Sequence, residues 1–149
     1  AHLAREVIDE LATTQPAARS IRLHADVNLP TLPLDRIRVR LLLRNLLDNA
    51  LRHSADAPLP VELHLRRTGE AGQGIELEVR DHGPGVPDDQ LPHLAQAFFR
   101  PDSARTRNAG GVGLGLYLCR LVAQAHGGTF AVRNAKPGLA VTVTLPGAT

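Results

Sequence analysis

The chain has 149 residues, of which 43% are hydrophobic and only 3% aromatic, and its formal net charge is +2. This length and composition predict one globular domain with an aliphatic core. Basic residues are interspersed with acidic ones and form no stripe with aromatic side chains, which argues against a nucleic-acid-binding protein.

The cysteine content and the hydropathy of the sequence bear on the cellular compartment in which the domain lies. Cys119 is the single cysteine and lies in an apolar stretch, so we expect a core thiol and a reducing environment. No apolar run is long enough for a membrane-spanning helix or a secretory leader. We therefore expect a cytoplasmic domain, with any membrane anchor outside these residues.

The N-terminal third predicts a helix, a strand and a second helix. Apolar residues recur at helical spacing over residues 3–11, and they alternate with polar ones over residues 20–26. A proline-bounded loop over residues 28–33 follows. Asp35 is the expected N-cap of a long helix that ends near His53. This helix is apolar around most of its circumference, so we expect other structure to cover it.

Three polar side chains interrupt the long helix. Asn45, Asn49 and Arg52 follow one another after four and three residues, so they share one stripe. A solvated edge would explain such a stripe. Asparagine is a poor helix former, however, and two amide oxygens one turn apart suit a Mg²⁺ ion that takes its other ligands from nucleotide phosphates. Both interpretations stay open, and the second is favoured.

The middle of the chain predicts a hairpin that ends in an acidic turn. Residues 61–67 and 75–80 alternate in hydropathy, and the second strand leads into Asp81 and the glycines Gly83 and Gly85. Aspartate and glycine are common in turns, which is one explanation. Alternatively, the carboxylate accepts a hydrogen bond from an adenine amino group. Such a charged bond contributes about 1.5–3 kcal/mol and would select adenine.

A polar run precedes the last helix. Residues 88–97 predict a short helix, and residues 100–108 lack periodicity and carry Arg100, Arg105 and Arg107. These features fit a lid whose guanidinium groups reach phosphates, although a solvated loop explains each arginine singly.

Four glycines then lead into an apolar helix that begins near Leu114. They are Gly110, Gly111, Gly113 and Gly115. Glycines gather where the backbone bends sharply or approaches a ligand, and a helix N-terminus binds anions, but a hinge fits equally well. Their spacing matches neither a dinucleotide-binding loop nor a P-loop.

The C-terminal part predicts a closing hairpin. Gly127 and Gly128 end the apolar helix. Two alternating segments, residues 129–134 and 139–145, flank a turn at residues 136–138.

Four segments together resemble the motifs of one family. They are Asn45-Leu-Leu-Asp-Asn49-Ala-Leu-Arg-His53, Asp81-His-Gly-Pro-Gly85, Phe98-Phe-Arg100 and Gly111-Val-Gly-Leu-Gly115-Leu. In order and spacing they resemble the N, G1, F and G2 boxes of the catalytic ATP-binding domain of bacterial sensor histidine kinases. That family is related to DNA gyrase, the ninety-kilodalton heat-shock chaperone and the mismatch-repair ATPases. The resemblance covers about residues 3–146.

The resemblance implies a fold. It is a two-layer α/β sandwich of the Bergerat type, with a mixed, mostly antiparallel sheet of about five strands and three main helices on one face. A flexible ATP lid would span about residues 97–112. The whole chain, residues 1–149, would be one catalytic domain, without the dimerisation and phosphoacceptor domain of the family.

The resemblance also implies roles for single residues. Asn45 and Asn49 would hold Mg²⁺ against the phosphates of ATP, and Arg52 would touch phosphate. His53 would stack on the adenine, whose amino group Asp81 would recognise.

The remaining implied roles belong to the pocket wall and the lid. Gly83 and Gly85 would shape the pocket, and Arg100 and Arg105 would meet the terminal phosphate. With the two asparagines, Arg100 would complete the catalytic set. The lid would close on the phosphates at Gly111, Gly113, Leu114 and Gly115.

The sequence departs from the family pattern in three respects. The F box reads Ala95-Gln96-Ala97-Phe98 where the family has Phe-x-Pro-Phe. Gyrase-like ATPases carry a water-activating glutamate at the position of Asn45, so its absence favours phosphoryl transfer to a protein over hydrolysis. None of the seven histidines has the acidic residue and proline that follow the family's phosphoacceptor.

The sequence therefore predicts the ATP-binding kinase domain of a two-component sensor histidine kinase. It would present Mg-ATP to a histidine in a separate helical domain, and a response regulator would then receive the phosphoryl group. The resemblance implies the cytoplasmic portion of a membrane-anchored homodimer of the inner membrane, with this domain monomeric in isolation. Two alternatives of the same fold stay open: an anti-sigma-type serine kinase and a nucleotide-sensing pseudokinase module.

Overall fold

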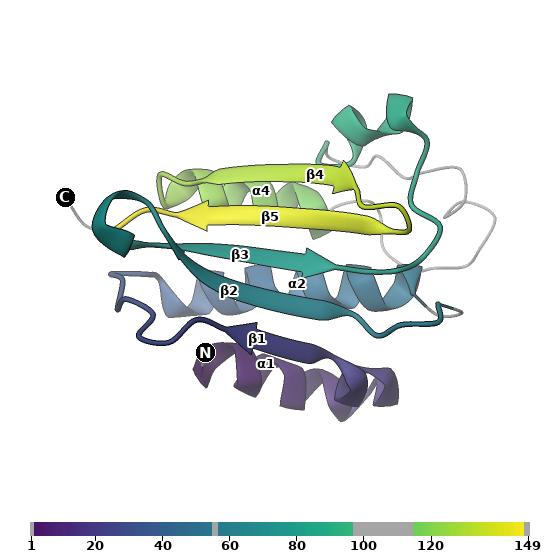
Figure 1. Cartoon of the computed structure of the whole chain (residues 1–149), viewed down its shortest axis with the longest axis horizontal. Helices are drawn as coiled ribbons and strands as arrows, with labels where there is room; N and C mark the ends of the chain where they lie inside the picture. The colour runs from purple at the N-terminus through teal and green to yellow at the C-terminus, as the bar shows by residue number, and fades with distance from the viewer. Residues whose placement is uncertain (1, 55–56, 97–114, 148–149) are drawn as a thin grey trace.

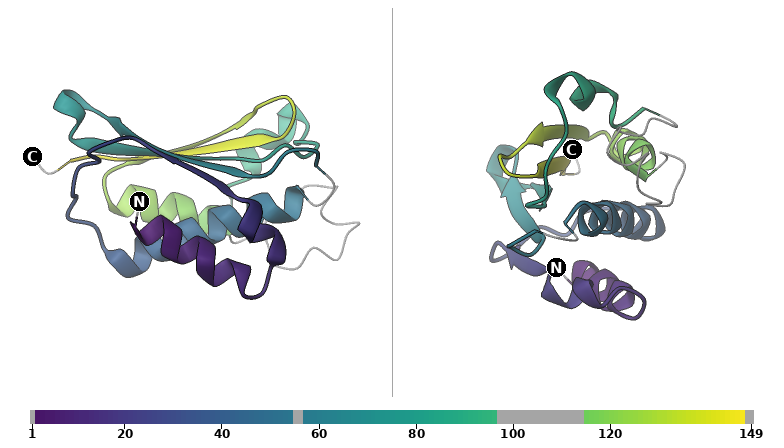
Figure 2. Two further views of the ribbon diagram at one scale, coloured as in Figure 1. Left: turned by 60° about the horizontal axis from the view of Figure 1, so that its bottom comes forward. Right: turned by 90° about the vertical axis from the view of Figure 1, so that its right-hand side faces the viewer.

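In the computed structural model, three helices cover one face of a five-stranded sheet (Figures 1 and 2). The structure describes residues 2–54, 57–96 and 115–147. The strands are β1 (Arg22–Ala25), β2 (Glu62–Thr68), β3 (Gly74–Arg80), β4 (Thr129–Asn134) and β5 (Leu139–Leu145). The α-helices are α1 (His2–Ala12), α2 (Arg36–His53) and α4 (Gly115–Ala125), and the 3-10 helices are η1 (Pro16–Ser20), η2 (Glu70–Gly72) and η3 (Asp88–His93).

The strand order is β1-β2-β3-β5-β4. β1 pairs with β2 in parallel, whereas the other neighbouring strands are antiparallel. The expected mixed, mostly antiparallel sheet with three helices on one face is therefore confirmed. The bounds of the closing hairpin also agree with the two segments predicted from alternation.

The two faces of the sheet differ in burial and polarity, because successive side chains along a strand point to opposite faces. Leu63, Leu65 and Leu77 are buried and belong to the hydrophobic core beneath the helices. The residues between them, such as His64 and Glu76, are only half-buried. The sheet is thus covered on one face and carries polar side chains on the other.

The long helix α2 begins at the predicted N-cap. The Asp35 carboxylate accepts hydrogen bonds from the backbone N–H groups of Ile37 and Arg38, each at 3.1 Å. The expectation that other structure covers most of this helix is wrong for its first half, where Ile37 is 81% and Leu41 43% exposed. The helix lies in a single layer between α1 and α4, so its side away from the sheet faces solvent (Figure 2).

Two other elements differ from the predictions. The segment expected as a short helix over residues 88–97 is the 3-10 helix η3, which contains Pro92. Proline has no N–H to donate and disfavours a continuing α-helix. The first strand is shorter than residues 20–26, because η1 occupies the chain up to Ser20. None of the helices in the described ranges is long and apolar enough to cross a membrane.

Cys119 is a core residue, as predicted. It is fully buried in α4, and burial raises the pKa of its thiol from an ordinary 9.0 to about 12. The folded protein therefore holds this proton more tightly than the unfolded chain does. The resulting stabilisation is complete below about pH 9 and is lost as the pH rises from about 9 towards 12. We expect the free energy of unfolding to fall over this alkaline range more steeply in the wild type than in Cys119→Ala.

Urea unfolding at a series of pH values measures this difference. The Cys119→Ala variant keeps every other titrating group, so it serves as the internal control. The same alkaline slope in both proteins would contradict the assignment of the shift to Cys119.

Candidate functional site

The site is built around Asp81, which follows β3 directly and is 2% exposed. Its Oδ1 accepts hydrogen bonds from the backbone N–H groups of Gly83 at 3.0 Å and Leu139 at 3.2 Å. The N–H of Asp81 donates to the carbonyl of Leu139 at 3.0 Å. These bonds fix the carboxylate between the ends of β3 and β5. No residue in the described part of the chain donates a hydrogen bond to Oδ2, so that oxygen is available to a ligand.

The loop after Asp81 passes very close to the end of α2. A Cβ at Gly83 would lie 1.9 Å from the carbonyl oxygen of His53. At Gly138, whose φ is +84°, a Cβ would lie 2.0 Å from the carbonyl oxygen of Asp81. Only glycine permits these approaches. The close contacts bring Asp81 and the C-terminal turn of α2 together.

Asn134 holds the next part of this loop. Its Nδ2 donates to the carbonyl of Val86 at 2.8 Å and to Asp88 Oδ1 at 2.8 Å. Its Oδ1 accepts from the N–H of Val86 at 3.3 Å. Gly85 has a φ of +72°, and a Cβ there would lie 2.7 Å from Asn134 Oδ1. The last residue of β4 therefore holds the loop at Gly85, a residue that the sequence predicts to shape the pocket.

Asn45 and Asn49 lie on α2, about two turns and one turn before His53. Both side chains are half-buried. The Nδ2 atom of Asn45 is buried, and no described residue accepts a hydrogen bond from it. An unpaired buried amide costs about 1–3 kcal/mol, so a polar ligand at this position would be stabilising. Amide oxygens one turn apart also provide the hard ligands that Mg²⁺ prefers.

Arg52 and His53 complete the predicted set on α2. The Arg52 side chain is 43% exposed, and its Nη2 lies 3.2 Å from Asp48 Oδ2. Asp48 also accepts a hydrogen bond from Gln15 Nε2 at 2.6 Å, which links α2 to the chain after α1. His53 is half-buried, and its backbone carbonyl forms the contact with Gly83. The structure thus places the end of α2 beside the Asp81 loop, with Arg52 at the surface.

The predicted lid falls outside the described residues. This applies to the lid at residues 97–112, to the F box from Ala97 onwards and to five predicted ligands. These are Arg100, Arg105, Gly111, Gly113 and Leu114. Gly115 is described as the first residue of α4, and a Cβ there would meet none of the described residues within 4 Å.

Sequence reasoning missed two positions of the site, Asn134 and Gly138. Asn134 ends a strand just before a turn, where a short amide side chain commonly bonds to nearby backbone. From the sequence alone, Gly138 is only part of a hairpin turn. Its role becomes visible once β3 and β5 are neighbours, because Asp81 then lies against it.

A buried carboxylate at the end of β3 thus lies beside a helix that carries two asparagines, as the family resemblance implies. Residues 34–149 match the family described as "Histidine kinase-, DNA gyrase B-, and HSP90-like ATPase". The chain belongs to this family of ATPase domains. Within that family, its similarity to sensor histidine kinases places it among their ATP-binding domains. The predicted family is therefore confirmed.

Three comparisons show the extent of the similarity. The chain is 37% identical over 142 residues to the sensor histidine kinase YkoH of Bacillus subtilis, which covers 95% of this chain and 29% of YkoH. It is 37% identical over 113 residues to the histidine-protein kinase BaeS of Escherichia coli, covering 75% of this chain and 23% of BaeS. The solved structure of the mycobacterial sensor histidine kinase MprB has a TM-score of 0.78 and 27% identity, covering 98% of this chain and 94% of that one. The chain thus spans less than a third of these two curated relatives.

Proposed function

We propose that this chain binds Mg-ATP and, as part of a longer sensor histidine kinase, presents the γ-phosphate to a histidine of a separate helical domain. A response regulator then receives the phosphoryl group. The observation that carries the proposal is the Asp81 carboxylate, which is buried, is fixed through Oδ1 and receives no hydrogen bond at Oδ2 from any described residue.

The carboxylate selects the base. The amino group of adenine donates a hydrogen bond to Oδ2, whereas guanine presents a carbonyl oxygen there, which a carboxylate repels. A buried charge without a ligand partner is costly, and this increases the preference for a donor. ATP is therefore favoured over GTP. His53, at the end of α2, stacks on the adenine, and Gly83 and Gly85 let the base lie against the backbone.

The asparagines of α2 hold the phosphate end of the nucleotide. Asn45 and Asn49 provide amide oxygens to Mg²⁺, which neutralises phosphate charge when bound. Arg52 exchanges its surface ion pair with Asp48 for a phosphate contact. In the lid, Arg100 and Arg105 contact the terminal phosphate. The backbone at Gly111, Gly113, Leu114 and Gly115 closes on the phosphates.

The transfer step uses this domain for positioning and charge neutralisation. An imidazole nitrogen of the acceptor histidine forms a bond to the γ-phosphorus while the bond to the bridging oxygen breaks, and ADP leaves. Gyrase-like ATPases have a water-activating glutamate at the position of Asn45. Because asparagine cannot act as that base, hydrolysis of ATP is disfavoured.

The names of the relatives bear on the two alternative functions. They are named as sensor kinases, so a serine kinase of the anti-sigma type and a nucleotide-sensing pseudokinase are not favoured. A solved structure of full-length ShkA in complex with AMPPNP matches this chain over 99% of its length with 26% identity and a TM-score of 0.71. It supports nucleotide binding by this fold.

The proposed intact protein is a membrane-anchored homodimer, with this monomeric domain in the cytoplasm.

Replacing Asn49 with alanine tests the magnesium part of the proposal. In the wild type, Mg²⁺ should strengthen ATP binding, and ATP should bind more tightly than GTP. In Asn49→Ala, the affinity with Mg²⁺ should fall about 10-fold or more, because one ligand of the ion is lost. The affinity without Mg²⁺ should change little. Calorimetric titration of ATP and GTP, with and without Mg²⁺, measures these differences.

Gln124→Ala is the matched control, because it removes an exposed amide from the neighbouring helix α4. It should bind ATP like the wild type under both conditions. An Asn49→Ala variant that keeps the full magnesium dependence would refute the metal assignment, and equal affinity of the wild type for ATP and GTP would refute the base assignment.

A further inference from the structure

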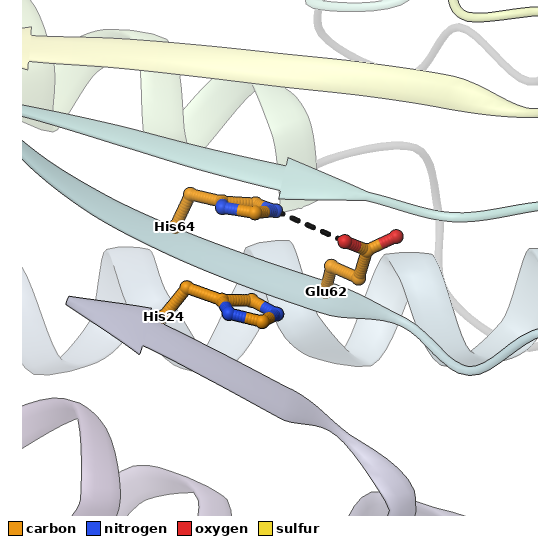
Figure 3. Close-up of side chains that lie close together, drawn as sticks. All are labelled: His24, Glu62 and His64. Atoms are coloured by element: carbon orange, nitrogen blue, oxygen red, sulfur yellow. Dashed lines mark hydrogen bonds and ion pairs between the residues drawn. The ribbon is translucent and has the colours of Figure 1, made fainter.

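Three side chains that commonly bind metals lie together on the sheet face opposite the helices. They are His24 of β1 and Glu62 and His64 of β2 (Figure 3). One ligand atom from each lies within 4.8 Å of the others. This cluster contains none of the residues assigned to the nucleotide site, so the proposed ATP binding leaves it unexplained.

The sheet itself brings these side chains together. His24 and His64 are direct partners in the parallel pairing of β1 with β2. Glu62 precedes His64 by two residues and therefore points to the same face of β2. The two imidazole rings stack with their centroids 4.7 Å apart and an angle of 12° between their planes. All three ligands are thus placed by neighbouring strands.

The spacing suits a small, tetrahedrally coordinated ion. His64 Nε2 lies 3.1 Å from Glu62 Oε1. Two ligands of a tetrahedral zinc ion, each about 2.0–2.2 Å from the metal, are about 3.3–3.6 Å apart. These two atoms are therefore already close to the distance that a shared ion requires. His24 is exposed, so its ring is able to turn towards that ion.

A buried histidine orients the carboxylate. His82 is 7% exposed, and its Nε2 lies 2.9 Å from Glu62 Oε2, the oxygen that His64 does not contact. With Oε2 held by His82, Oε1 is the oxygen that lies beside His64. Hydrogen bonds of this kind position the ligands of metal sites and tune their affinity.

Basic groups nearby limit the affinity of such a site. Arg22 and Arg80 are the register partners of Glu62 on the two adjacent strands. Both bring positive charge near a bound cation, although Arg80 donates to the carbonyl of Ala135 at 3.4 Å. Glu78 lies opposite His64, but its carboxylate pairs with Arg66 at 3.6 Å and with Arg133 at 3.5 Å. We therefore expect micromolar rather than nanomolar binding.

We propose that His24, Glu62 and His64 form a binding site for a divalent transition metal, with Zn²⁺ as the expected ion. Two imidazoles and one carboxylate leave one tetrahedral position for water, a set that Zn²⁺ accepts. Imidazole ligands also suit Co²⁺ and Ni²⁺, whereas Mg²⁺ prefers oxygen ligands. This site is therefore distinct in chemistry and in place from the magnesium of the nucleotide.

The test is calorimetric titration of Zn²⁺ into the chain without nucleotide, followed by titration of Co²⁺ monitored by visible absorption. One ion should bind per chain, and Co²⁺ should give the strong visible bands of a four-coordinate complex. Loss of a partner that only orients a ligand typically costs about 10–100-fold in affinity, so loss of a ligand itself in His24→Gln should cost at least as much. Glu62→Gln should weaken binding similarly.

His2→Gln is the matched control. His2 is an exposed histidine that also pairs with a glutamate, since its Nε2 lies 2.9 Å from Glu6 Oε1 on α1. This variant should bind Zn²⁺ like the wild type. Because His24 is exposed, its replacement should leave the unfolding midpoint unchanged. The proposal is wrong if the wild type binds no ion, or if His24→Gln binds as tightly as His2→Gln. No nucleotide is present, so the result is independent of the proposed ATP binding.

Discussion

Replacing Asp81 with asparagine should greatly weaken ATP binding while leaving the fold intact. The amide oxygen of the variant keeps the hydrogen bonds from Gly83 and Leu139, so its NH₂ group takes the place of Oδ2. A donor then faces the amino group of adenine, which is itself a donor. Loss of a charged hydrogen bond costs about 1.5–3 kcal/mol, or roughly 10–150-fold in affinity, and the opposed donors add to this. Calorimetric titration of ATP measures the loss.

Asp89→Asn is the control for this substitution. Asp89 is an exposed acid in η3, and its replacement changes the net charge by the same amount without touching the site. It should bind ATP like the wild type. An Asp81→Asn variant that binds ATP with wild-type affinity would show that the base is recognised elsewhere.

Replacing Gly83 with alanine should destabilise the protein and damage the site together. The added Cβ would lie 1.9 Å from the carbonyl oxygen and 2.9 Å from the carbonyl carbon of His53. Both are backbone atoms, so the clash is relieved only if the loop moves away from α2. We expect a loss of about 3 kcal/mol or more in the free energy of unfolding, together with weaker ATP binding. Urea unfolding measures the first effect, and calorimetry measures the second.

Gly115→Ala is the control for the unfolding measurement. A Cβ at Gly115 would meet no atom of the described residues within 4 Å, and the residue begins α4, where alanine loses less backbone entropy than glycine. Its stability should therefore equal or exceed that of the wild type. Equal urea midpoints for Gly83→Ala and Gly115→Ala would show that the loop is not held against α2.

Much of the fold could be predicted because its signals are local. The Asp35 cap and the bounds of the closing hairpin follow from residues only a few positions apart. The prediction that other structure covers most of α2 failed, because the exposure of a side chain depends on its tertiary environment. The exposure of Ile37 and Leu41 depends on which side of α2 the sheet and the other helices leave open, and an apolar pattern does not contain that information.

The residues of the candidate site also fall into those that local sequence signals predict and those that only the tertiary structure reveals. Asp81 and the two asparagines were found because polar residues stand out in an apolar helix and at a strand end. Asn134 and Gly138 were missed because each acts on a loop far away in the chain. Only the pairing of β5 between β3 and β4 brings these partners together.

By itself, the sequence determined the order of the helices and strands, the caps and turns between them, and the family to which the chain belongs. These depend on periodicity, on backbone preferences and on motifs read along the chain. Only the tertiary structure decided which distant groups meet: the contact of Gly83 with the end of α2, and the grouping of His24 with Glu62 and His64. Such contacts depend on strand pairing and helix packing, which bring residues together through the whole core rather than through neighbouring positions.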